Sequence, residues 1–173
     1  MILARTGTTT SESAPVAVSG ALAFTSISVG SFHTCGVTTT GAAYCWGSTN
    51  FGQLGLGHLP GTHVETPMPV LGGLSFVAVS SDDKHTCGIT TDSAAYCWGQ
   101  GAYGRLGHGF TSTAVFPVPV SGGFSFSSVS AGGNHTCGLT IATTAYCWGL
   151  NDAGELGDGT NTARTVPVLV LGP

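Results

Sequence analysis

The sequence carries very little charge. Its 173 residues include 4 Lys and Arg and 8 Asp and Glu, so that 7% of the chain is charged, against about 25% in a typical soluble domain. The formal net charge is -4. Proteins that bind nucleic acid neutralise its phosphates with lysine and arginine side chains. The scarcity of both residues therefore predicts that nucleic acid is not a partner.

Helix-forming stretches and long apolar runs are missing as well. No segment is rich in the Lys, Glu, Leu and Gln that favour helices, which indicates an all-β protein. No run of 18 apolar residues occurs, so no membrane span is expected. Residues 1–14 lack the apolar core of a signal peptide, and we expect none there. The chain is nevertheless 42% hydrophobic, which predicts a folded domain rather than a disordered one.

What the sequence does contain is glycine, 28 residues of it, and a motif pair that occurs three times. His-Thr-Cys-Gly-x-Thr is followed five residues later by Ala-Tyr-Cys-Trp-Gly, at residues 33–47, 85–99 and 135–149. One repeat contains four short apolar segments separated by turn residues, and the first repeat predicts strands at residues 24–29, 33–38, 42–46 and 67–70. A repeat of about 50 residues with four antiparallel strands is typical of a β-propeller blade.

The spacing of the motif pair predicts a hairpin. With the turn at Thr39-Thr40-Gly41, Val37 lies opposite Ala43, and Cys35 then lies opposite Cys45. We expect the other side of the hairpin to place an aromatic ring, that of Tyr44, over Gly36.

This register predicts three disulfides. The pairs are Cys35–Cys45, Cys87–Cys97 and Cys137–Cys147. Two alternatives remain open: reduced thiols in the core, and a metal site built from His33, Cys35 and Cys45 in each repeat. The metal alternative lacks the ligand spacing usual for zinc, so no metal and no cofactor are expected. Disulfides form in oxidising compartments, which favours a secreted protein, outside the cell or at its surface.

The repeat resembles that of the regulator of chromosome condensation family. The resemblance rests on His-x-Cys-Gly, Tyr-Cys-Trp-Gly, Gly-(Gln/Arg/Glu)-Leu-Gly and Pro-x-x-Val, and it covers residues 15–170. The cysteines make it similar to the bacterial and extracellular members. The family implies a β-propeller, usually of seven blades, that serves as a protein-binding platform. Its members include a nucleotide-exchange factor for a small GTPase and a secreted β-lactamase inhibitor, but neither activity has a locatable element here.

The sequence departs from the family at two points. The family's Trp-Gly-x-Asn-x-x-Gly is complete only at 148–154, because Thr49 and Gly101 replace Asn151 in the other repeats. There are also three repeats instead of seven. They span residues 19–70, 71–120 and 121–173, and they follow a segment, 1–18, that we expect to supply the tail and outer strand of an incomplete or partner-completed blade.

Three blades leave two outer faces uncovered. Burying roughly 500 Å² of apolar surface on each would contribute on the order of 12 kcal/mol at about 25 cal/mol/Å². We therefore expect a partial propeller completed by other copies of itself, through the open blade faces and terminal strands, as a ring or a filament. Two alternatives stay open: a recognition module from a longer propeller that binds another protein, and an enzyme with a site in the central channel.

No catalytic residue is predicted. The strand that would line a channel offers Ser, Ala and Gly, and the repeated His33, His85 and His135 are interpreted as strand-end histidines that bond to a neighbouring loop. The loop around Asn151 and Asp158 does not match the calcium-binding pattern. Loop residues that differ among the repeats are the candidates for interaction with a partner. They are Phe51, His58, Tyr103, Arg105, Phe110, Asp152 and Glu155.

Overall fold

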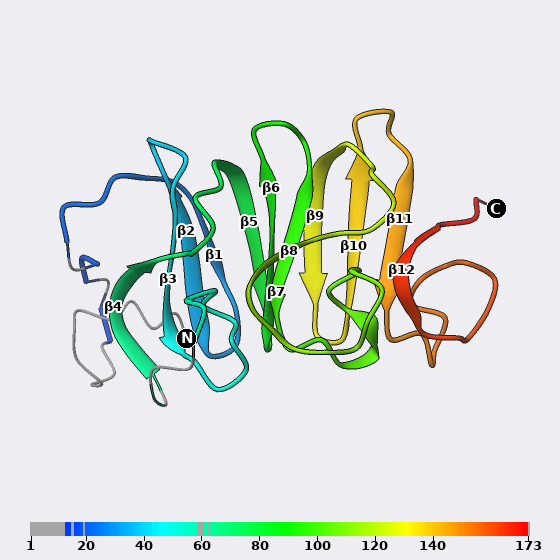
Figure 1. Cartoon of the computed structure of the whole chain (residues 1–173), viewed down its shortest axis with the longest axis horizontal. Coiled ribbons are helices and arrows are strands. Elements are labelled where there is room, and N and C mark those ends of the chain that lie inside the picture. Colours follow the sequence, from blue (N-terminus) through cyan, green and yellow to red (C-terminus); the bar gives the residue numbers. More distant parts are fainter. Residues whose placement is uncertain (1–12, 15, 19, 59–60, 62, 173) are drawn as a thin grey trace.

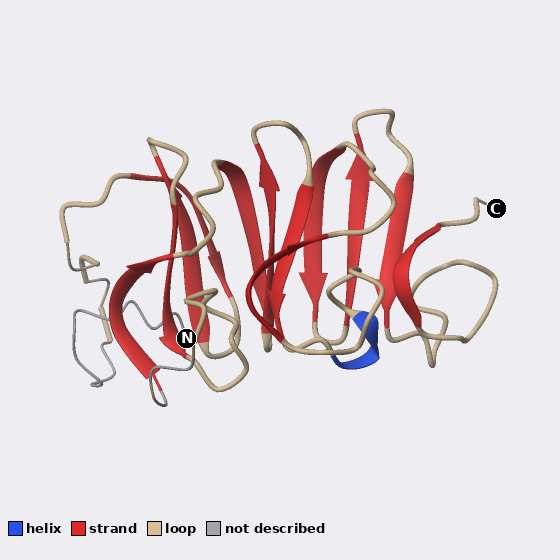
Figure 2. Ribbon diagram, viewed as in Figure 1, coloured by secondary structure: helices blue, strands red, loops and turns tan. Residues whose placement is uncertain are grey.

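The computed structural model describes residues 13–14, 16–18, 20–58, 61 and 63–172. This part of the chain forms three four-stranded antiparallel sheets and one short 3-10 helix, η1 (Ala102–Gly104). The sheets are blades that lie side by side in sequence order (Figures 1 and 2). The predicted fold class, all-β with propeller blades, is confirmed.

Each blade is a meander of consecutive strands. The first contains β1 (Phe24–Val29), β2 (His33–Thr38), β3 (Ala43–Ser48) and β4 (His63–Pro69). The second contains β5 (Phe76–Asp82), β6 (His85–Thr90), β7 (Ala95–Gly99) and β8 (Ala114–Pro119). The third contains β9 (Phe126–Gly132), β10 (His135–Thr140), β11 (Ala145–Gly149) and β12 (Arg164–Leu169). The strands of each blade fall within one predicted repeat.

The first blade shows how well the strands were predicted. The bounds of β1 and β2 are those expected, whereas β3 ends two residues later and β4 begins at His63 instead of residue 67. The pairing of β3 with β4 passes an irregularity between Cys45 and Gly47, after which Ser48 pairs with His63. Beyond this irregularity β4 continues towards its N-terminal end, before the segment that contains the prolines. The sequence pattern rested on that segment and therefore made the strand too short.

The hairpin register was predicted correctly. Cys35 pairs with Cys45 and Gly36 with Tyr44, and the other two blades repeat both relations. The structure contains the three disulfides that this register brings together. Gly41 has a φ of +83° in the first turn, as the turn chemistry requires.

The ring over the glycine is not the one expected. A Cβ on Gly36 would lie 2.7 Å from the Phe24 ring, and Gly88 and Gly138 stand in the same relation to Phe76 and Phe126. The phenylalanine belongs to the first strand of its blade, so the prediction that Tyr44 covers Gly36 is wrong. The register shift between Phe24 and Ser26 accompanies this placement, and a shift within the strand is invisible to a hairpin count.

The hydrophobic core lies between the blades. Each blade has a disulfide face, which carries its cystine and the Val37, Ile89 or Leu139 position. Its other side is an aromatic face, which carries the paired Phe and Trp rings. The disulfide face of the first blade packs on Phe76, Val79 and Trp98 of the second, and the second packs likewise on the third. At both junctions the disulfide face of one blade therefore packs against the aromatic face of the next.

The expected outer strand in segment 1–18 is not found in the part that the structure describes. Residues 1–12 and 15 lie outside the described residues, and residues 16–18 form no strand. A strand is defined by its pairing with a neighbour. No fourth sheet is present among the described residues, and the outer strand stays a prediction because most of segment 1–18 lies outside them.

Candidate interaction faces

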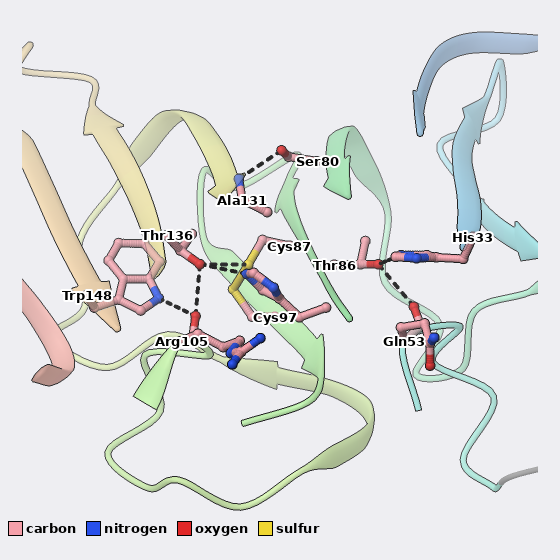
Figure 3. The surroundings of a disulfide bond; sticks show 11 residues. His33, Gln53, Ser80, Thr86, Cys87, Cys97, Arg105, Ala131, Thr136 and Trp148 are labelled. Carbon is pink, nitrogen blue, oxygen red and sulfur yellow. Dashed lines mark hydrogen bonds between the residues drawn. A yellow bond between two sulfur atoms is a disulfide. The ribbon is translucent and has the colours of Figure 1, made fainter. Parts of the chain in front are cut away.

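The two blade junctions share one hydrogen-bond arrangement. At the first junction, His33 Nε2 lies 2.7 Å from Thr86 Oγ1, and this hydroxyl donates to the carbonyl oxygen of Gln53 at 3.0 Å. At the second, His85 Nε2 lies 2.8 Å from Thr136 Oγ1, which donates to the carbonyl oxygen of Arg105 at 2.9 Å (Figure 3). A hydroxyl has a single proton to donate. Each histidine must therefore carry its proton on Nε2 and donate it to the threonine.

Burial keeps these histidines neutral. Desolvation lowers the pKa of His33 to about 4, against the smaller opposing effect of the Asp83 charge. Desolvation also lowers the pKa of His85 to about 3, helped by the nearby Arg105 charge. The Nδ1 atoms of both rings are buried and have no hydrogen-bond partner. The histidines were expected to bond to a neighbouring loop, but the partner of each is a threonine on a strand of the next blade. The histidine and the threonine together join two blades.

Serines on the first strands of the first and second blades add a second bond across the two junctions. Ser28 Oγ accepts from the backbone N–H of Ser81 at 2.8 Å, and Ser80 Oγ accepts from that of Ala131 at 2.9 Å (Figure 3). The small residues expected to line a channel are therefore used for joining blades. Both kinds of bond join the disulfide face of one blade to the aromatic face of the next: the histidine donates across the junction, and the serine accepts across it.

The aromatic face of the first blade has no blade before it among the described residues. Ile27 on this face is 53% exposed, whereas Val79, at the same place in the second blade, is 9% exposed. Val29 is exposed too, whereas Ser81 in the second blade is buried. On this face Ile27 and Val29 are therefore exposed, whereas Trp46 and Thr34 are buried.

The disulfide face of the third blade is open in the same way. Leu139 is 39% exposed, whereas Val37 and Ile89 at the equivalent positions are buried against the next blade. Cys137 is only half-buried, in contrast to the fully buried Cys35 and Cys87. The described residues therefore expose Leu139 on the disulfide face of the third blade and Ile27 and Val29 on the aromatic face of the first.

Four of the predicted interaction residues are exposed loop residues, as expected. Phe110 and Tyr103 present large apolar surface to solvent. Asp152 and Glu155 are exposed, and Glu155 accepts from the backbone N–H of Ala153 at 2.9 Å.

The other three predicted residues are tied into the fold to different degrees. His58 is exposed, and its Nδ1 lies 2.8 Å from the carbonyl oxygen of Leu56. Phe51 is half-buried under the Lys84 ammonium, 5.1 Å from its ring centre. The prediction that Arg105 is an exposed anchor is wrong, because this residue is 1% exposed. Its guanidinium donates to Gly133 O and Asn134 Oδ1 at 2.9 and 2.5 Å, because its loop packs against the third blade.

Sequence reasoning missed Ile27 and Leu139. Both belong to the repeated framework, and the search for interaction residues considered only loop positions that differ among the repeats. The signal was present in the register, since position 27 matches Val79 and position 139 matches Ile89. It required the knowledge that each blade buries its two faces against different neighbours.

The loop around Asn151 uses its oxygens internally. The buried Asn151 amide donates to the carbonyl oxygens of Thr160 and Thr162, and its Oδ1 accepts from the backbone N–H of Leu156. Asp158 pairs with Arg164 at 2.9 Å. Within the described residues no group of three or more His, Cys, Asp and Glu side chains could hold a metal ion. The described chain also has no helix that is long and apolar enough to cross a membrane.

The Asn151 position explains one departure between repeats. In the second blade it is Gly101, where a Cβ would lie 1.8 Å from the backbone oxygen of Ser112. In the third blade the side chain of Asn151 holds the loop together, whereas in the second blade the backbone of the equivalent loop lies directly against Gly101. One framework position thus closes its loop in two different ways.

Comparison with proteins of known sequence finds two kinds of relative. The chain is 36% identical over 83 residues to the ultraviolet-B receptor UVR8 of Arabidopsis thaliana, a match that covers 48% of this chain and 19% of UVR8. It is 35% identical over 85 residues to the human E3 ubiquitin-protein ligase HERC2, covering 48% of this chain and 2% of HERC2. The chain thus spans less than a fifth of either relative.

Solved structures share the fold. Prp20p from Saccharomyces cerevisiae superposes with a TM-score of 0.76 at 21% identity, over 86% of this chain and 38% of Prp20p. The ectodomain of the receptor kinase CR4 from Physcomitrella patens gives a TM-score of 0.52 at 29% identity, over 74% of this chain and 30% of the ectodomain.

The family follows from the repeats themselves. A model of the regulator of chromosome condensation (RCC1) repeat matches residues 24–53, 76–105 and 126–155, and a second model with the same description matches residues 40–89 and 92–139. Each match of the first model begins at the first strand of a blade and ends in the loop that follows its third strand. The chain therefore belongs to the RCC1 repeat family.

Proposed function

We propose that this protein acts by binding other proteins, and that its first partner is another copy of itself. The coarse part of this proposal has support in the family, because the structurally similar Prp20p binds Gsp1p and histones. The self-assembling part has support in the blades of this chain. On this proposal the protein is a structural component and not an enzyme.

The observation that carries the proposal is the pair of open faces. Ile27 is exposed, whereas Val79, its equivalent at the first internal junction, is buried; Leu139 is exposed, whereas its equivalents Val37 and Ile89 are buried. Burying such surface stabilises an association by about 25 cal/mol/Å² before the entropy of association is subtracted. Closure would give a ring, such as a six-blade dimer, and non-closing contacts would give a filament.

Sedimentation velocity at several protein concentrations tests the proposal. We expect species of twice the monomer mass or more, whose share increases with concentration. Electron microscopy of the same samples distinguishes discrete rings from fibres. A single species with the monomer mass at every concentration would contradict self-assembly.

We also propose that the protein works in an oxidising compartment, outside the cell or at its surface. Support comes from the three disulfides, each of which closes a hairpin at the centre of a blade. The test is the mass of the protein isolated from its native source, before and after reduction. A gain of about six protons, one for each cysteine sulfur, is expected, and an unchanged mass would contradict the compartment.

A second candidate function is recognition of a different protein by the loops. Phe110 is 67% exposed at a loop tip, and the His108 ring lies edge-on 5.6 Å from it. Exposed aromatic residues are frequent anchors of protein interfaces. Replacement of Phe110 by Ser separates the two functions: recognition would be weakened, whereas self-assembly through the blade faces would persist.

A further inference from the structure

Asn134 begins the single Asn-x-Ser/Thr motif of the sequence, Asn134-His135-Thr136. This motif is the one at which secreted proteins receive an N-linked oligosaccharide on the asparagine side chain. So short a motif also occurs by chance. Its surroundings in the fold therefore decide whether this asparagine can carry a bulky group.

The asparagine lies in the tight turn between β9 and β10. His135 pairs with Gly132, so the turn consists of Gly133 and Asn134. The Asn134 carbonyl oxygen accepts from the backbone N–H of Leu150 at 2.9 Å, which holds the turn in place. Gly133 is exposed, and a Cβ built on it would meet no atom within 4 Å. The turn therefore borders on open space.

The same turn position carries large side chains at the surface in the other two blades. It is the residue before the repeated histidine, which is Phe32 in the first blade and Lys84 in the second. Phe32 is 64% exposed, and the side chain of Lys84 is 35% exposed. The fold therefore accommodates bulk at this position.

Arg105 fixes the orientation of the Asn134 amide. A guanidinium only donates hydrogen bonds, and Arg105 Nη2 lies 2.5 Å from the Asn134 side chain, so the atom that it meets is Oδ1. Among the described residues Nδ2 has no hydrogen-bond partner, and it is not one of the buried atoms that lack a partner. The oxygen is therefore engaged, whereas the nitrogen is free and reaches solvent.

Resting on the oxidising compartment proposed above, we infer that Asn134 is the acceptor of an N-linked oligosaccharide. The donor is an oligosaccharide carried on a polyprenyl diphosphate. Nδ2 forms a bond to the anomeric carbon of the first sugar, the bond from that carbon to the diphosphate oxygen breaks, and the diphosphate leaves with the electron pair. The amide loses one proton to solvent. Oδ1 takes no part and continues to accept from Arg105.

The threonine of the motif sets the time of the transfer. Thr136 is 0% exposed, and its hydroxyl lies between His85 Nε2 and the carbonyl oxygen of Arg105 (Figure 3). An enzyme that reads this hydroxyl cannot reach it once the second and third blades have joined. Transfer therefore precedes the closure of that junction, and the oligosaccharide then stays on the surface of the folded chain.

Secretion of the chain from a eukaryotic cell line tests the site. We expect a product heavier than the polypeptide, and an amidase that releases N-linked oligosaccharides should remove the extra mass and leave aspartate at position 134. Asn134→Asp keeps an oxygen for Arg105 but lacks the amide nitrogen, so it should be secreted without the extra mass. Thr136→Ser keeps the hydroxyl of the junction and the motif, and it should retain the modification.

Ala163→Thr is the matched positive control. It completes the same motif at Asn161, which lies in an exposed loop, and should add a second oligosaccharide. A secreted chain without an oligosaccharide on Asn134 would overturn the inference. Extra mass that persists in the Asn134→Asp variant would overturn it as well, because the modification would then lie elsewhere.

The order of events has a test of its own. The purified, folded chain, incubated with the transferase and the lipid-linked donor, should stay unmodified, because Thr136 is buried. The reduced, unfolded chain should be modified under the same conditions. Equal modification of both would overturn the proposed order.

The inference and the compartment on which it rests can fail separately. Peptide mass spectrometry of the protein from its native source reports on both. Reduced cysteines would contradict the oxidising compartment. Intact disulfides together with an unmodified Asn134 would leave the compartment standing and overturn the inference alone.

Discussion

His33 Nε2 donates to the Thr86 hydroxyl, 2.7 Å away, across 53 residues of sequence and the junction between two blades. The same bond recurs between His85 and Thr136. In both cases the threonine hydroxyl donates a hydrogen bond to a backbone carbonyl oxygen in a loop of the preceding blade. The repeated His-Thr dipeptide is therefore a joint: its histidine reaches forward to the next blade and its threonine receives from the previous one.

Thr86→Val should destabilise the fold strongly. Valine has the shape of threonine but leaves the His33 N–H and the Gln53 carbonyl without their partner in a buried junction. Each unpaired buried group costs about 1–3 kcal/mol, so a decrease of about 2–3 kcal/mol in the free energy of unfolding is expected from urea titration. Thr39→Val, at an exposed turn position, is the control and should change it by less than about 0.5 kcal/mol.

Stability should decrease as the pH falls from 6.5 to about 4. His33 has its pKa lowered by burial from 6.5 to about 4, so over this range the unfolded chain binds a proton that the folded chain does not. The loss for His33 is about 3 kcal/mol, and His85, lowered in the same direction, adds to it. Urea titrations at pH 7, 6, 5 and 4 measure the slope.

The His33→Gln variant identifies the source of that slope. Glutamine keeps a side-chain N–H donor but does not titrate, so the variant should lose part of the pH dependence. Asp158, whose pKa is lowered to about 2 chiefly by its hydrogen bond to Thr160, acts in a lower window, below the usual pKa of an aspartate. Equal slopes for the variant and the unmodified chain would show that His33 is not the group responsible.

The disulfide Cys137–Cys147 should be reduced before the other two. Cys137 is half-buried on the open disulfide face, whereas Cys35, Cys45, Cys87 and Cys97 are fully buried at junctions. Thiol attack requires access to a sulfur atom. Limited reduction in dilute solution, followed by alkylation and peptide mass spectrometry, should show labels on Cys137 and Cys147 first. Early labelling of Cys87 would contradict the packing described.

Gly101→Ala should be more harmful than its small volume suggests. The added methyl would meet the backbone oxygen of Ser112 at 1.8 Å, and backbone cannot move aside as a side chain can. The loop between β7 and β8 would have to shift, at a cost of about 1–3 kcal/mol. Gly133→Ala is the control, because no atom lies within 4 Å of its added methyl. Thermal unfolding of both variants makes the comparison, and equal melting temperatures would contradict it.

The sequence alone determined the four-stranded blade and the disulfide that links its two central strands. A motif pair repeated three times fixes the hairpin register, since cross-strand partners follow from counting residues on either side of a turn. The pairing of Cys35 with Cys45 needed no further information. The same local reasoning failed for the ring over Gly36, because Phe24 reaches it from a different strand through a register shift.

Only the tertiary structure decided how blades meet. Whether Arg105 is an exposed anchor or a buried tie to Asn134 depends on the loop of one blade packing against the next, which no local pattern encodes. Ile27 and Val79 are alike in sequence and in register, yet one is exposed and the other buried. The difference arises because burial depends on a neighbouring blade, and the presence of that neighbour is a property of the packed molecule and not of the repeat.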